Sequence, residues 1–353
     1  MPLRFQQRAA PPAAFAVTLP LAAIATTFLL TAAIVVAAGE SPFRAYQEFL
    51  LRPLSSEFRI LEVLVSSTPI LFTGAAVAIA FRAGYWNIGA EGQLLSGAIA
   101  AAWLGRQVDG WPPVASLPLL VVGGALAGAA WALPPALMRV RFGIDEVVTT
   151  LLLNPVALLM VGGLLNGPWR DPVTRFPESP RIAPAAEFPQ LVDRSRLHFG
   201  FLLALAVLAV GWFVTTQTAT GLRLRAVGLS PHAARFAGIR IERTLLGAAL
   251  ASGGIAGIAG VSEVAGIQFR LTEGISSGFG YTGIVVATLG ALSMIGVAFA
   301  AFFLGLVNVG AGSASRVLDV PSQLGEVITA TLLLVTVALL VLRRYRVVRV
   351  GSP

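Results

Sequence analysis

A succession of apolar runs, each long enough to cross a lipid bilayer as a helix, limits the folds that this chain can adopt. The first covers residues 9–39 and contains no charged residue. A helix needs roughly 20 apolar residues to cross the hydrocarbon core of a bilayer. Of all 353 residues, 56% are hydrophobic and only 12% are charged. A typical soluble domain is about twice as rich in charge, so the chain is predicted to be an integral membrane protein.

Ten runs are predicted to be transmembrane helices. After the first, they cover residues 61–80, 88–104, 114–138, 147–165, 199–216, 245–261, 283–294, 295–312 and 324–342. Several are short or contain glycine, which packed helices in lipid tolerate. A cleaved signal peptide ending near residues 36–38 is the alternative for the first run, but the run is too long for one. The predicted fold class is therefore all-α and polytopic.

The distribution of arginine predicts the orientation, since cytoplasmic loops of membrane proteins are enriched in positive charge. The chain contains no lysine. With the N-terminus inside, the outer segments are 40–59 and 166–198, which mix arginine with similar numbers of acidic residues. Both termini are then cytoplasmic. The arginines expected in the cytoplasm are Arg4, Arg8, Arg139, Arg141, five between Arg223 and Arg243, Arg343, Arg344, Arg346 and Arg349. The proline-rich segment 166–198 is expected to be irregular and exposed.

Composition excludes several classes of function. The chain has no cysteine and two histidines, so no catalytic residue, metal ligand or cofactor is predicted. Without lysine it cannot form the nucleotide-binding pattern G-x-x-x-x-G-K-[ST], so an ATP-driven process needs a separate ATPase. The net charge of +8 lies in clusters between apolar runs, which is typical of a membrane protein and does not indicate nucleic-acid binding.

Residues 84–97, GYWNIGAEGQLLSG, place polar side chains beside a predicted span. Glycines at this spacing permit close packing or a broken helix, and transporters bind solutes at such breaks. Asn87, Glu91 and Gln93 are therefore candidate residues of a substrate pathway. Each also has a structural alternative: Asn87 as a helix N-cap, Glu91 in the first turn of a helix, and Gln93 as an interhelical hydrogen-bonding group.

Residues 220–244 form the long basic cytoplasmic segment and include a short predicted helix. Ser230 is expected to be its N-cap, Pro231 its first residue and Gly238 the residue that ends it. A short helix of small residues suits docking to another protein. The alternative is a basic loop that rests on anionic lipid headgroups.

A third stretch, residues 263–296, is rich in glycine and interrupts the apolar pattern near the outer face. It is predicted to be a connector that dips into the membrane or forms an outer vestibule. Arg270 is expected to pair with Glu263 or Glu273, and a place in the substrate pathway is the alternative.

Together these stretches resemble the permeases of bacterial ABC importers for nucleosides and simple sugars. The resemblance is carried by FRAGYWNIGAEGQLLSGA at 81–98, by GLRLRAVGLSPHAARFAGI at 221–239 and by the glycine-rich block 253–290. It is strongest to the larger permease of nucleoside importers that are fed by a lipoprotein receptor of the basic-membrane-protein type.

The resemblance implies one transmembrane permease domain over 1–353, with two inverted halves of about 1–198 and 199–353, in the bacterial cytoplasmic membrane. It also implies a coupling loop at 217–243 that docks on a cytoplasmic ATP-binding subunit. Its further implied partners are a second permease, likewise membrane-embedded, and an extracytoplasmic solute-binding lipoprotein. The residues implied for the coupling helix are Ser230, Ala233, Ala234 and Gly238.

Other functions stay open on the sequence. The solute could be a pentose, another simple sugar or a branched-chain amino acid, because the receptor largely sets selectivity in such importers. From a different class, an ion-coupled secondary transporter would move solute without an ATPase, with Glu91 as its protonation site.

Overall fold

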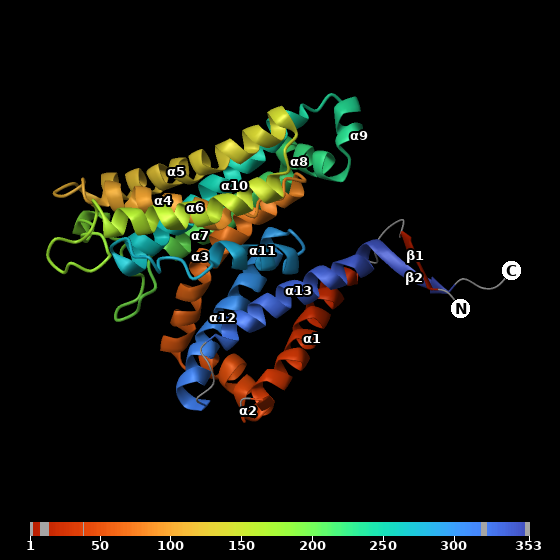
Figure 1. Ribbon diagram of the computed structural model, residues 1–353, viewed down its shortest axis with the longest axis horizontal. Helices are drawn as coiled ribbons and strands as arrows, with labels where there is room; N and C mark the ends of the chain where they lie inside the picture. Colours follow the sequence, from red (N-terminus) through yellow and green to blue (C-terminus); the bar gives the residue numbers. More distant parts are fainter. Residues whose placement is uncertain (1–2, 8–13, 38, 319–322, 350–353) are drawn as a thin grey trace. The chain divides into compact units, whose positions relative to one another are not determined.

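The computed structural model describes residues 3–7, 14–37, 39–318 and 323–349, which fold into helices and one short two-stranded ribbon (Figure 1). The chain divides into two compact units. We call residues 56–306 the central unit, and residues 1–55 with 307–353 the terminal unit. This division differs from that of the two predicted halves, whose inverted relation stays a prediction.

The central unit contains the helices that carry the candidate residues. They are α3 (Glu57–Arg82), α4 (Ala90–Gly105), α5 (Pro113–Phe142), α6 (Glu146–Asn166), α7 (Phe199–Gln217), α8 (Ala219–Leu229), α9 (Pro231–Phe236), α10 (Ile241–Glu263) and α11 (Phe279–Leu289). Two single turns, η3 (Pro184–Ala186) and η4 (Val264–Gln268), lie in the connections. Helix α12 (Met294–Leu318) begins in the central unit and ends in the terminal unit.

The terminal unit brings the two ends of the chain together. Its helices and turns are α1 (Phe15–Ala37), α2 (Pro42–Tyr46), η1 (Gln47–Leu51), η2 (Arg52–Leu54) and α13 (Leu324–Arg344). Helix α1 packs along α13. The strands β1 (Leu3–Gln7) and β2 (Tyr345–Arg349) pair antiparallel, with Leu3 opposite Arg349. The sequence did not predict this ribbon.

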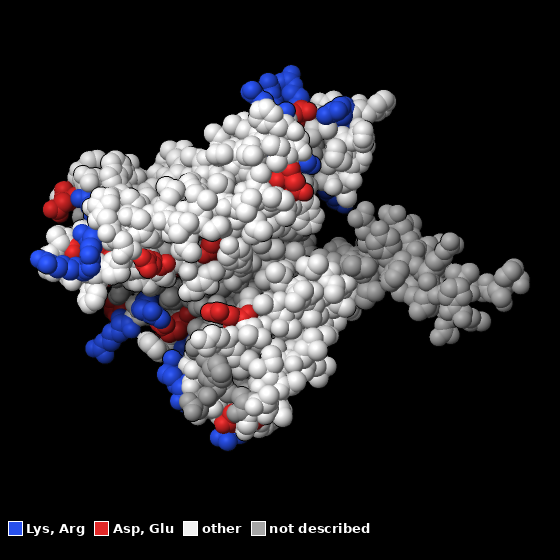
Figure 2. All heavy atoms as spheres, viewed as in Figure 1, with Lys and Arg blue, Asp and Glu red and all other residues white. Residues whose placement is uncertain are grey.

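The predicted spans correspond one to one with helices, which confirms the polytopic all-α fold class. Among the described residues, seven helices are long and apolar enough to cross a membrane: α1, α3, α5, α6, α7, α10 and α12. Helices α4 and α11 are shorter, with 16 and 11 residues. Figure 2 shows charged side chains mainly towards the ends of the central helices, with a largely uncharged surface between them.

Burial separates the inner helix from the outer ones. In α3, 83% of the apolar window is buried, against 22% in each of α5, α6 and α7. A helix that is apolar all round and buried belongs to the interior, whereas the other three present apolar side chains to their surroundings. The outer helices are therefore the ones suited to contact lipid.

Helix α10 packs on α5, α4 and α3 at the centre of this unit (Figure 1). Gly257 lets the backbones meet, because a Cβ on it would lie 3.1 Å from the Cα of Gly128 on α5. On the other side, a Cβ on Gly97 of α4 would lie 2.5 Å from the Cα of Gly257. Small residues at such crossings permit close van der Waals packing. In lipid this packing holds helices together, because the hydrophobic effect does not act between them there.

The proline-rich segment is irregular as predicted, but part of its second half is buried. Ile182, Ala186 and Phe188 are buried. The reason is that its backbone pairs with the connector after α10: the Ile182 N–H donates to the Phe269 carbonyl at 2.9 Å, and the Phe188 N–H to the Ala265 carbonyl at 2.8 Å. Pairing satisfies both backbones, which allows them to be buried.

Candidate functional site: a helix break and a short exposed helix

The chain leaves helical geometry between α3 and α4, at residues 83–89. Ala83, Tyr85 and Asn87 are buried there, so the break lies inside the central unit. Backbone N–H and C=O groups that lose their helical partners need other ones in an apolar interior. Neighbouring side chains must therefore supply the hydrogen-bond partners of residues 83–89.

Helix α6 supplies most of these hydrogen-bond partners, through three residues that were not predicted from the sequence. Glu146 Oε1 accepts from the Trp86 N–H at 3.2 Å, and Thr150 Oγ1 accepts from the Ile88 N–H at 3.2 Å. Asn154 Nδ2 donates to the Ile88 carbonyl at 2.9 Å, while its Oδ1 accepts from the Gly92 N–H at 2.9 Å. All three side chains are buried. Their spacing of four places them on one face of α6, and this polar stripe in an apolar helix was the readable signal.

The two amides of the break bind each other. Asn87 Nδ2 donates to Gln93 Oε1 at 2.8 Å and to Ser252 Oγ of α10 at 2.9 Å. Gln93 Nε2 donates back to Asn87 Oδ1 at 3.1 Å, and that oxygen also accepts from the Gly89 N–H at 2.9 Å. Asn87 is therefore not the N-cap of α4, a position that Gly89 occupies. It closes a turn just before the helix.

Glu91 joins α4 to the start of α11. It lies in the first turn of α4 and is 8% exposed. Its Oε2 accepts from the Gly280 N–H at 2.7 Å, and Ser276 and the Gly278 N–H hydrogen-bond to the same carboxylate. The N-terminal ends of two helices, α4 and α11, thus meet at one carboxyl group, and their dipoles favour its charged form. That geometry stabilises the short helix α11 within the unit.

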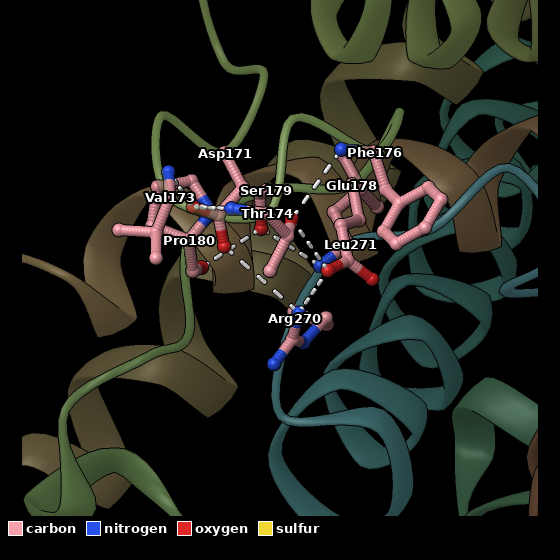
Figure 3. Close-up of polar contacts among 9 residues, drawn as sticks. All are labelled: Asp171, Val173, Thr174, Phe176, Glu178, Ser179, Pro180, Arg270 and Leu271. Atoms are coloured by element: carbon pink, nitrogen blue, oxygen red, sulfur yellow. Dashed lines mark hydrogen bonds and ion pairs between the residues drawn. The ribbon is translucent and has the colours of Figure 1, made fainter.

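Arg270 lies away from these three residues, in the connector between η4 and α11. The expected pairing with Glu263 or Glu273 is wrong: Arg270 binds Glu178 and lies 4.0 Å from Asp171, both in the proline-rich segment (Figure 3). Phe269, with φ 57°, turns the chain after η4 and directs Arg270 to that segment. Glu273 instead accepts from Asn166 Nδ2 at 2.8 Å.

Backbone pairing surrounds this ion pair (Figure 3). The Ser179 N–H donates to the Leu271 carbonyl, and Ser179 Oγ accepts from the Leu271 N–H, both at 2.9 Å. The Arg270 side chain is 27% exposed, so the pair is partly shielded from solvent. Arg270 therefore fastens the proline-rich segment to the connector.

Two further polar side chains, those of Arg196 and His198, lie at the end of the proline-rich segment. His198 is the N-cap of α7, where its Nδ1 accepts from the Gly200 N–H at 3.1 Å, and burial lowers its pKa to about 4. Arg196 binds Glu62, and this hydrogen bond raises the pKa of the guanidinium. The imidazole is thus neutral at pH 7 and serves as a helix cap.

The short helix α9 forms where the sequence placed it. Ser230 Oγ accepts from the Ala233 N–H at 3.3 Å, Pro231 is the first helical residue, and Gly238 has φ +79° after the C-cap. Glycine reaches that left-handed region without strain, which allows the chain to leave the helix sharply.

The two faces of α9 differ in burial. Ala234 is buried against Val227 and Ile241, so it anchors the helix to the rest of the unit. Ala233 is exposed, and Phe236 is 98% exposed. Phe236 was not predicted as a site residue, although a large apolar residue in a basic helix of small residues is a signal that the sequence contains.

Residues 59–341 match the family described as branched-chain amino acid transport system / permease component. The chain belongs to this permease family. The match covers the break, the connector and α9, so all the candidate residues of this permease lie inside the family region.

Three relatives resemble the permease over nearly its whole length. The glucose ABC transporter permease protein TsgB13 of Haloferax volcanii is 34% identical, over 98% of this chain and 93% of its own. The guanosine ABC transporter permease protein NupP of Bacillus subtilis is 34% identical, over 89% of this chain and 91% of its own. The nucleoside ABC transporter permease protein NupB of Lactococcus lactis is 31% identical, over 90% and 89%. No solved structure matches the chain.

Proposed function

We propose that this permease is the membrane-spanning subunit of an importer that moves nucleosides, or related simple sugars, across the bacterial cytoplasmic membrane. Relatives named for guanosine, nucleosides and glucose support this solute range. A polar break inside an apolar bundle supports a passage for such solutes, because polar groups at a break can line a cavity. Pentoses and branched-chain amino acids are the alternative solutes.

Residues 1–353 then form one transmembrane permease domain whose halves, about 1–198 and 199–353, are inverted repeats. Both termini lie in the cytoplasm. The permease has no ATPase site of its own and works with a cytoplasmic ATP-binding subunit. Its other partners are a second permease, which makes a heterodimer, and an extracytoplasmic solute-binding lipoprotein. The arginine distribution supports this orientation.

In this arrangement Asn87, Glu91 and Gln93 shape the wall of the pathway, and Arg270 holds its outer cover. The hydrogen bonds of the two amides within the protein support a shaping role, since an amide already paired has little capacity left for a solute. Solute is then recognised mainly by the receptor.

The observation that carries the proposal is α9. A helix capped at both ends, anchored through Ala234 and presenting Phe236 to solvent is suited to transmit motion from a partner. Large aromatic side chains contribute disproportionately to binding when they enter a partner's pocket. We place the coupling loop at 217–243, with Ser230 and Gly238 fixing the ends of the helix and Ala233 on its exposed surface.

The test is Phe236→Ala in the complex reconstituted with its ATPase subunit and receptor. Loss of an aromatic anchor that contributes about 2 kcal/mol should weaken ATPase binding roughly 30-fold and abolish most uptake. Phe299→Ala is the control, because Phe299 is also an exposed phenylalanine but lies in α12, within the predicted span 295–312 and outside the coupling loop. Unchanged coupling in the Phe236 variant would contradict the proposal. Solute uptake by the permease alone under a sodium or proton gradient would favour a secondary transporter instead.

A further inference from the structure

A groove of about 1010 Å³, open to the surroundings, lies between α7, α8 and α10 of the central unit. This is as large as the cavities that hold small molecules in other proteins. Its walls are almost entirely apolar over most of their length. Side chains that form these walls include Leu203, Val207, Val210, Val214, Ala251 and Ile255.

One end of the groove is strongly basic. Arg223 of α8, together with Arg240 and Arg243 at the start of α10, lines it. Among the residues that the structure describes, no acidic side chain lines the groove and none of these three arginines forms an ion pair. The groove therefore has an apolar body and a positively charged mouth.

Two of these arginines are exposed residues at a helix N-terminus, where the helix dipole disfavours positive charge. Arg240 is the N-cap of α10 and Arg243 lies in its first turn, where the helix dipole is already positive. The one acidic residue of that turn, Glu242, pairs with Arg235. An anionic group between Arg223, Arg240 and Arg243 would relieve this repulsion.

We propose that the groove binds an anionic phospholipid, with its phosphate at the three arginines and an acyl chain between α7 and α10. The outer edge of the groove supports a lipid over a soluble anion. Val210 at this edge and Phe213 beside it are 61% and 56% exposed, so the apolar wall continues onto the outer surface of α7. A lipid can enter sideways from the bilayer, whereas a soluble anion would use only the mouth.

The bound lipid would touch the segment that carries α9. Residues 237–240, which follow α9 directly, line the basic mouth of the groove. A bound lipid would therefore hold residues 237–240, at the C-terminal end of α9, against α8 and α10. This consequence rests on the proposed function, in which α9 couples the permease to its ATPase, but lipid binding itself does not.

The binding test uses the full-length permease in nanodiscs of phosphatidylglycerol and phosphatidylcholine, with bound lipid counted by native mass spectrometry. The combined variant Arg223→Gln, Arg240→Gln and Arg243→Gln should lose at least 10-fold of its bound phosphatidylglycerol. The matched control replaces three exposed arginines of the proline-rich segment with Gln, namely Arg170, Arg175 and Arg194. This control should retain the lipid.

A second variant tests the acyl-chain half of the site without changing charge. Gly247 lines the groove, and a Cβ on it would meet no atom within 4 Å, so Gly247→Leu should fill the groove while α10 remains helical. This variant should also lose the lipid. Retention of phosphatidylglycerol by Gly247→Leu would overturn the proposal, because the arginines would then hold headgroups only at the surface.

Two other outcomes would also overturn it: equal retention of phosphatidylcholine and phosphatidylglycerol, or absence of bound lipid in the unaltered permease. The second would point to a protein helix, such as one from the second permease, as the occupant. Unchanged coupling of ATP hydrolysis to uptake in the Phe236→Ala variant, with phosphatidylglycerol still bound, would contradict the proposed role of α9 and leave the lipid site supported.

Discussion

Four buried polar residues around the break bind backbone groups of the protein itself. Glu146, Thr150 and Asn154 bind the groups freed by the break. Glu91 does the same for the start of α11. A buried group left without its partner costs about 1–3 kcal/mol, so these contacts decide whether the break can exist.

Glu91→Ala should lower the free energy of unfolding by about 1–3 kcal/mol, because the Gly280 N–H would lose its acceptor. Glu91→Gln should lose less, since the amide oxygen can still accept. Thermal unfolding of the purified permease measures both, with Asp193→Ala as a control on an exposed acidic residue. If the Gln variant unfolds normally but loses uptake, the charge of Glu91 has a role in transport that the shaping role does not include.

At the scale of elements, the meeting of α4, α5 and α10 depends on backbone contact. The three helices approach so closely at Gly257 that no side chain fits there. The same surface joins the break, on the N-terminal side of α4, to the long outer helix α5. A substitution at this crossing should therefore also shift the residues of the break, which belong to the candidate pathway.

Gly257→Val should destabilise the permease by about 1–3 kcal/mol or prevent its assembly, because its Cβ would come within 3.1 Å of the Gly128 Cα and closer still to the Gly124 carbonyl oxygen. Gly163→Val on α6 is the matched control, since a Cβ there meets nothing within 4 Å. The measurement is the folded fraction after detergent extraction. Equal yields of the two variants would contradict the close crossing.

How much the sequence could predict varies from element to element. The spans and the ends of α9 follow from local rules of length, capping and proline placement, and those predictions are confirmed. The partner of Arg270 was predicted wrongly, because the turn at Phe269 directs it to a segment about 90 residues earlier in the chain. The role of α6 was not predicted, because its polar side chains bind residues of the break, which lie about 60 residues earlier in the chain. Contacts between residues so far apart cannot be read from a single sequence.

At the scale of the whole molecule, orientation in the membrane is the property that the proposed function most requires. α9 must face the ATPase, and the proline-rich segment must face the receptor. The absence of cysteine makes this directly measurable, because an introduced thiol has no background.

In intact cells, a membrane-impermeant maleimide should label Asp193→Cys in the proline-rich segment and leave His232→Cys of α9 unlabelled. Both side chains are exposed, so burial does not decide the result. Permeabilised cells should show labelling at both positions, which is the internal control. The reverse pattern in intact cells would invert the proposed topology.

The dependence of the break on α6 has a consequence for how the permease is made. The Trp86 N–H donates its hydrogen bond to Glu146, 60 residues later in the chain. At about 5–20 residues per second, the ribosome needs roughly 3–12 s to cover that distance. During this interval the turn before α4 has no native partner on α6. Helices α3 to α6 should therefore leave the insertion machinery as one group, held there until the last of them arrives.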